Sequence, residues 1–327
     1  MKRIFSLFIL LIFFISCKKP DSTYYTINQV RVVAALFQTS ALVTGTTING
    51  TSTQQFPMRP NETCTGAPEF NIVVISPTSE IPTLTINSLK VAGIGYYYLA
   101  KGGGGRGLPN GTKGTSLPLT TFFSSATPAT TTIMTSPFRL TVFTFTAACV
   151  NFNNANLTTN LETVNDIPAF MINYSVTSGV STDQGFYTFY YLPLKTDSWW
   201  SSAAVTSSVS SKISSITSGL AVTNSPSQFG TLSPIASSTI NANSGNAISA
   251  PVTIPNVPTG RDANSSLFQA STRIQWYVTS GSLDLDTAAI TTWNPETTAG
   301  TSVGGLVVVR DLLGGVDFKI FGPFTTQ

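Results

Sequence analysis

The chain has 327 residues, of which only 9% are charged, with 17 basic residues, 14 acidic residues and no histidine. The absence of histidine excludes Ser-His-Asp and Cys-His catalytic arrangements and removes the commonest metal ligand. Without Lys2 and Arg3, which we expect to be cleaved off, 15 basic residues face 14 acidic ones, and this balance excludes an electrostatic case for binding nucleic acid.

The first 16 residues have the pattern of a signal peptide. Residues 1–3 read MKR, and residues 4–15 (IFSLFILLIFFI) are apolar except for Ser6. Twelve residues are too few to cross a bilayer, which takes about 20. A charged start followed by a short apolar run is typical of secretory signals.

Residues 14–17, Phe-Ile-Ser-Cys, resemble the lipobox of bacterial lipoproteins. In that family the signal is cleaved before the cysteine, which is then acylated, with palmitate among the usual chains. Phe14 stands where leucine is usual, which is similar to the lipoboxes of spirochaetes. The resemblance implies that Cys17 is lipidated and that residues 17–22 tether the protein to the cell envelope. Lys18 favours the outer membrane, since enteric lipoproteins kept at the inner membrane have aspartate there.

An ordinary signal peptide with a chance cysteine at position 17 is the alternative. If Cys17 is lipidated, Cys64 and Cys149 are the two cysteines left. An oxidising envelope favours a disulfide between them, and closing that loop would stabilise the fold by roughly 4–5 kcal/mol. Two unpaired thiols are the alternative.

Residues 23–196 are expected to form a β-rich domain. Short runs rich in Val, Ile, Thr, Phe and Tyr alternate with Pro, Gly, Asn and Ser clusters, which indicates an all-β sandwich or barrel. The predicted strands cover residues 26–33, 71–75, 84–89, 93–99, 138–150, 169–176 and 186–192. The glycine-rich residues 101–114 lack the Gly-Lys-Ser/Thr order of a phosphate-binding loop, so we interpret them as a surface loop.

Residues 197–220 interrupt the β pattern. Apolar residues from Val205 to Leu220 recur at intervals of three or four, which predicts a short helix, and a Ser-rich connector is the alternative. Trp199 and Trp200 are expected to pack at the junction between domains, with ligand stacking as the alternative role.

Residues 221–327 are expected to form a second β-sandwich of immunoglobulin-like size. Residues 273–278 (RIQWYV) and 316–320 (VDFKI) alternate between apolar and polar side chains, as strands with one face on a core do. Residues 306–309 (LVVV) are apolar throughout, which is typical of a central strand. The fold class is therefore all-β, with two sandwich-like domains joined by the connector.

This second domain resembles bacterial Ig-fold repeats of the PKD-like or cadherin-like kind. The resemblance rests on Trp276 followed by Gly281, on Trp293-Asn294-Pro295, and on residues 309–317 (VRDLLGGVD). The segment departs from these repeats at Gly304-Gly305, where strand residues are usual. The resemblance implies a spacer or adhesive module on a cell surface, with Trp276 as a core anchor.

Acidic residues gather in the second domain, and calcium, which prefers carboxylate oxygens, is the one cofactor they suggest. The candidate ligands are Asp284, Asp286, Asp311 and Asp317. The simpler interpretation is that these carboxylates bond the backbone in turns, with no cofactor.

These patterns together predict a lipid-anchored, non-enzymatic protein of the cell envelope with a role in adhesion, binding or envelope structure. Its partners would be the membrane and a protein or glycan ligand, and not nucleic acid. One alternative is a glycan-acting enzyme using Glu162, Asp166 or Asp183, because such hydrolysis needs only carboxylates. The other alternative is a subunit of an envelope assembly.

Overall fold

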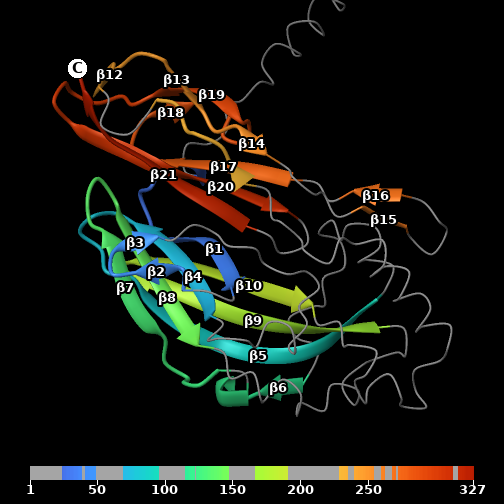
Figure 1. Ribbon diagram of the computed structural model, residues 1–327. Coiled ribbons are helices and arrows are strands. Elements are labelled where there is room, and N and C mark those ends of the chain that lie inside the picture. The colour runs from blue at the N-terminus through green and yellow to red at the C-terminus, as the bar shows by residue number, and fades with distance from the viewer. Residues whose placement is uncertain are drawn as a thin grey trace, which may run out of the picture.

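The computed structural model describes residues 24–38, 41–48, 69–95, 115–121, 123–146, 166–190, 228–234, 239–253, 259–261, 267–269, 272–311 and 316–327. Within these ranges the chain is built from β-strands and one short 3₁₀ helix, η2 (Leu119–Thr121), with no α-helix. The predicted all-β fold class is confirmed. The sheets stack face to face, as in β-sandwiches (Figure 1).

Two antiparallel sheets are formed by the first half of the described chain. One has the order β1 (Arg31–Gln38), β4 (Glu69–Ser76), β8 (Arg139–Thr146) and β7 (Ala129–Met134). The other has the order β10 (Ser181–Tyr190), β9 (Asp166–Ser178), β5 (Thr83–Gly95) and β6 (Thr115–Leu117). A small hairpin joins β2 (Val43–Thr44) to β3 (Thr47–Ile48).

The second half also forms two main sheets. The larger has the order β12 (Thr239–Ile240), β21 (Val316–Thr326), β20 (Ser302–Asp311) and β17 (Thr272–Val278). The smaller has the order β13 (Asn246–Ser249), β19 (Ile290–Asn294) and β18 (Ser282–Leu283). Two strand pairs complete this half: β11 (Gln228–Phe229) with β14 (Val252–Thr253), and β15 (Thr259–Arg261) with β16 (Leu267–Gln269).

Three apolar cores separate these four layers. The outer core lies between the two sheets of the first half and the C-terminal core between the two sheets of the second. The outer core includes Phe70, Ile72, Val74, Leu89, Phe143, Phe145, Ile172, Tyr174 and Val176. The C-terminal core includes Tyr25, Ile248, Trp276, Val278, Leu283, Trp293, Val307, Val309, Phe321 and Phe324.

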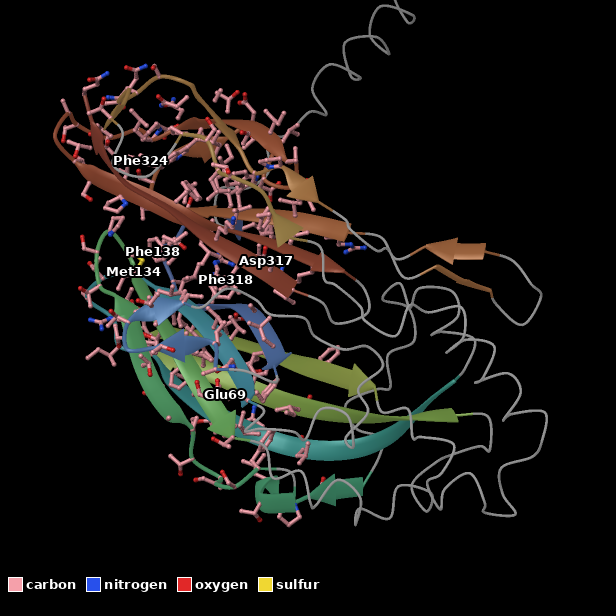
Figure 2. All side chains as sticks on the ribbon, in the orientation of Figure 1. Glu69, Met134, Phe138, Asp317, Phe318 and Phe324 are labelled. Atoms are coloured by element: carbon pink, nitrogen blue, oxygen red, sulfur yellow. The ribbon has the colours of Figure 1, made fainter. Side chains whose placement is uncertain are left out.

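The middle core joins the two halves. It packs the sheet containing β4 and β8 against the sheet containing β20 and β21, with Phe138 from the first half and Phe318 from the second among its members (Figure 2). Its members are Ile27, Val33, Ala34, Leu36, Leu42, Val73, Ile75, Phe138, Leu140, Val142, Tyr277, Leu306, Val308, Val316 and Phe318. The contact between the halves is therefore a continuous hydrophobic core, not a polar surface contact.

Strands β4 and β20 are buried on both faces. Because successive side chains of a strand point to opposite sides, Ile72 and Val74 enter the outer core while Val73 and Ile75 enter the middle core. The same alternation divides residues 306–309 of β20 between the middle and C-terminal cores. This two-sided burial explains the continuous apolar runs at residues 72–75 of β4 and 306–309 of β20, and it confirms the prediction of a central strand at residues 306–309.

The C-terminal core is organised by tryptophans, and the predicted role of Trp276 as a core anchor is confirmed. Trp276 is 1% exposed, and its ring meets Phe321 edge-on at 5.3 Å between centroids. Its indole N–H donates to the Ala288 carbonyl at 2.7 Å, while that of Trp293 donates to Ser280 at 2.8 Å. Both buried indoles thus have satisfied donors, as buried tryptophans need.

Position 305, where the Ig-like repeats usually have a strand residue, is glycine for a steric reason. A Cβ at this position would lie 2.0 Å from the Tyr277 carbonyl oxygen and 2.6 Å from Cζ of Phe321. The β20–β21 pairing shifts register between Val303 and Gly305. Glycine at this irregularity lets the backbone of β20 approach β17 and the aromatic cluster closely.

The strand predicted over residues 26–33 is wrong in its extent. Thr26 bridges Val278 in the second half, whereas β1 begins only at Arg31 and pairs with β4 in the first half. Between them the chain turns, and the Asn28 N–H bonds the Thr26 carbonyl at 2.9 Å. The break occurs because the chain here crosses from one sheet layer to the next.

Candidate functional site

Several residues singled out from the sequence lie outside the described residues. They are Cys17, Cys64, Cys149, Glu162, Trp199, Trp200, the loop 101–114 and the connector 197–220. Lipidation of Cys17 and the Cys64–Cys149 disulfide therefore stay predictions.

The calcium candidates are distributed over different elements. Asp284 and Asp286 lie in the loop after β18, and Asp286 accepts a hydrogen bond from the Gln275 amide at 3.0 Å. Asp317 lies on β21, 5% exposed, and accepts the Phe229 N–H at 2.8 Å. Asp311 ends β20, and its side chain is not among those described. No three His, Cys, Asp or Glu residues are grouped for metal binding in the part of the chain that the structure describes.

Asp317 corrects the expectation of a turn-capping carboxylate on the solvent side of its strand. Strand β11 covers Asp317, so this carboxylate is buried although it lies on the face of β21 away from the middle core. The buried charge is compensated by a backbone N–H from residue 229, 88 positions away in sequence. Its role is to hold β11 onto β21.

Asp183, a candidate for carboxylate catalysis, has a similar structural bond. It lies on β10, and its Oδ2 accepts the Val32 N–H of β1 at 2.7 Å. Two residues before Asp183 and Val32 in the chain, the Ser181 hydroxyl accepts the Val30 N–H at 3.1 Å. These bonds tie the edges of the two first-half sheets together. Asp166, the other described catalytic candidate, begins β9, and its side chain is not among those described.

A polar junction lies where β1 and β10 approach β20. The Arg310 guanidinium on β20 donates to the Val33 carbonyl on β1. Tyr174 on β9 is buried close by, opposite Gly185, where a Cβ would lie 2.6 Å from the tyrosine hydroxyl oxygen. Burial raises the pKa of Tyr174 from 10.0 to about 12; the Asp183 carboxylate adds to this, the Arg310 charge opposes it, and Tyr277 raises it slightly further.

The N-terminal segment enters the fold through the second half. The Val278 N–H donates to the Tyr25 carbonyl at 2.9 Å, and the Ile27 N–H donates to the Val278 carbonyl at 2.8 Å. The Tyr25 side chain is 1% exposed within the C-terminal core. Residues next to the expected tether thus form a single parallel β-bridge to one edge of β17. The one local signal for this was Asn28, a turn residue inside an otherwise strand-like run.

A nearly uncharged polar surface covers the outward side of β5, β9 and β10, which we call the outward face. Its side chains alternate with those that enter the outer core, so they point away from the stack. Register places them in three rows: Thr182, Thr177 and Thr83; Gln184, Ser175 and Thr85; and Phe186, Asn173 and Ser88.

Hydrogen-bonding groups and one aromatic ring characterise the outward face. The Asn173 amide donates to the Ser88 hydroxyl at 2.7 Å, which fixes the amide and leaves its oxygen for another donor. Phe186 is 46% exposed. Lys90 stands on the neighbouring row, beyond the three uncharged ones. Such a surface suits a ligand that is uncharged and rich in hydroxyl or amide groups.

Comparisons with known proteins do not assign this chain to a family. No family model matches the chain, and no curated protein matches it. Among solved structures, a chimeric titin Z1Z2 functionalized with a KLER exogenous peptide from decorin is similar at 14% identity, covering 79% of this chain and 87% of that one, with a TM-score of 0.17.

The junction predicts a loss of stability at alkaline pH. An unfolded tyrosine ionises near pH 10, but Tyr174 in the fold stays protonated to about pH 12. Between these values the unfolded state releases a proton that the folded state keeps, so the free energy of unfolding should fall by about 2–3 kcal/mol. Urea denaturation of the wild type and Tyr174→Phe should diverge over this range, with the variant losing less stability. Parallel curves would contradict this role of Tyr174.

Proposed function

We propose that this protein is a lipid-anchored component of a bacterial cell envelope, without enzymatic activity, that displays a binding surface. The observation that carries the proposal is the sequence Phe14-Ile15-Ser16-Cys17, followed a few residues later by a segment bonded to β17 of the fold. Acyl chains on Cys17 would hold the protein at a bilayer, since each buried methylene contributes about 0.8 kcal/mol.

A lipid anchor fits the rest of the described chain. No helix in the described ranges is long and apolar enough to cross a bilayer. The segment of residues 25–27 connects the expected tether to the C-terminal core through main-chain bonds and the buried ring of Tyr25. The anchor would therefore act on the folded body and not on a loosely attached arm.

The second half has the features of an Ig-like spacer. Two sheets enclose Trp276 and Trp293, and the segment that resembles PKD-like or cadherin-like repeats supplies β17, β19 and β20. These repeats act as spacers or adhesive modules, and the same role here would support the first half at the cell surface.

The binding role is assigned to the outward face of β5, β9 and β10. Its nine side chains have no charge, so no ionic group of the protein has to lose its hydration when a neutral ligand binds there. Hydroxyl and amide groups match the donors and acceptors of sugar hydroxyls, and the exposed Phe186 ring offers an apolar surface for a sugar face. We therefore propose a neutral glycan as the ligand class.

The lipid anchor is tested by a Cys17→Ala variant. Wild-type protein should partition into the detergent phase and pellet with membranes, whereas the variant should remain in the aqueous phase, because it has no acylated residue. Cys149→Ala is the matched control and should partition like the wild type. Unchanged partitioning of Cys17→Ala would remove the basis of the lipoprotein proposal.

The glycan ligand is tested on arrays of neutral and acidic glycans with the lipid-free protein. Wild type should bind neutral glycans, and Phe186→Ala and Asn173→Ala should each reduce affinity roughly tenfold, equivalent to about 1.4 kcal/mol. Ile290→Ala changes an even more exposed apolar side chain at the other end of the stack and should have no effect. Binding that is selective for acidic glycans, or insensitive to both variants, would refute the assignment.

A further inference from the structure

The direction of residues 25–27 shows where the tether reaches the fold. Thr26 bridges Val278 in parallel, so the residues before it run back along β17 towards Trp276. On the same edge of β17, the Trp276 N–H donates to the Asp286 carbonyl at 2.9 Å. Tyr24 therefore lies on the side of the loop of residues 284–290, which we call the entry loop.

The entry loop holds apolar side chains in solvent. Leu285 is 56% exposed and Ile290 is 70% exposed, while Tyr24, at the start of the described chain, is 66% exposed. The backbone at Leu285 lies beside the start of β19, because the Leu285 N–H donates to the hydroxyl of Thr291, the residue after Ile290, at 3.0 Å.

The loop backbone is firmly attached to the second half. Besides the Asp286 bond, the Ala288 carbonyl accepts the Trp276 indole N–H at 2.7 Å. The Ala289 carbonyl accepts the Ala250 N–H at 2.8 Å. These bonds hold the loop backbone at residues 286, 288 and 289. The exposed side chains of the loop therefore point in a fixed direction and stay in solvent.

The length of the tether sets how far the loop can lie from an anchor at Cys17. Seven residue steps separate Cys17 from Tyr24, and an extended chain covers at most about 3.3–3.6 Å per residue, or roughly 25 Å. The outward face lies three sheet spacings away from β13, β18 and β19, at about 10 Å each (Figure 1). A lipid at Cys17 thus brings the entry loop to the bilayer and leaves the outward face directed away.

We propose that the entry loop is the membrane-contacting surface of this protein, with Leu285, Ile290 and Tyr24 entering the headgroup region of the lipid layer. The proposal rests on the proposed lipid anchor. Asp284, exposed beside Leu285, disfavours binding of the loop alone to an anionic surface. The acyl chains supply the affinity, and the tether then raises the effective concentration of the loop at the membrane.

The test places a photocrosslinking amino acid at the loop and at a distant control site. Lipidated full-length protein, with Leu285→p-benzoylphenylalanine or Ile290→p-benzoylphenylalanine, is reconstituted into vesicles of phosphatidylethanolamine and phosphatidylglycerol. The matched control is Val180→p-benzoylphenylalanine, which changes a fully exposed apolar residue in the β9–β10 turn. After irradiation, flotation recovers the vesicle-bound protein and mass spectrometry identifies lipid adducts.

Lipid adducts at positions 285 and 290, with none at 180, are the expected result. Protein that floats with the vesicles but has no adduct at 285 or 290, or an equal yield at 180, would overturn the membrane-contact proposal and leave the lipid anchor intact. Protein that does not float would contradict the anchor, and with it this proposal. Cys17→Ala protein that also contains the 285 substitution should neither float nor form adducts.

Discussion

The middle core is the constraint on which the rest of the structure depends. It packs the sheet of β4 and β8 directly on the sheet of β20 and β21, so each of these sheets is covered on both sides. Strands in such a position need apolar residues at every position, not at alternate ones. The apolar runs at residues 72–75 of β4 and 306–309 of β20 follow from this requirement. The two halves consequently behave as one stack of four layers.

The chain has few charges, and two of its carboxylates bond the backbone where the layers of this stack meet. Where edges of sheets meet, polar side chains accept backbone N–H groups from segments distant in sequence: Asp183 binds Val32 and Asp317 binds Phe229. Buried main-chain groups need partners, and a carboxylate is a strong acceptor. These carboxylates stabilise the arrangement of layers. The continuous core then fixes the outward face relative to the N-terminal entry, so an anchor at one end would determine the direction of the surface at the other.

The sequence predicted the strands better than their partners. The alternating pattern at residues 273–278 and the apolar run at 306–309 are local, and they identified strands correctly. The pattern at 273–278 predicted a core on one face only, but Tyr277, on the other face, is buried in the middle core. The pairing of Thr26 with Val278 joins residues about 250 positions apart, and no local pattern specifies such a contact. For the same reason the sequence suggested Asp183 as a catalytic carboxylate and Asp317 as a calcium ligand or turn-bonding carboxylate, although each accepts a backbone N–H from a distant segment. The outward face could be recognised only after the strand register had aligned β5, β9 and β10, because the polar residues of any one of these strands do not indicate a binding surface.

The measurement that tests this account most directly is hydrogen exchange across both halves after a core substitution in the first. Leu140 on β8 lies in the middle core and Leu89 on β5 in the outer core, and both are buried. Each change to alanine should cost about 2–5 kcal/mol. We expect Leu140→Ala to accelerate exchange in β20 and β21 of the second half as well as in β4, and Leu89→Ala to affect β20 and β21 less. Wild-type protection of β20 and β21 in Leu140→Ala would contradict a single stack united by the middle core.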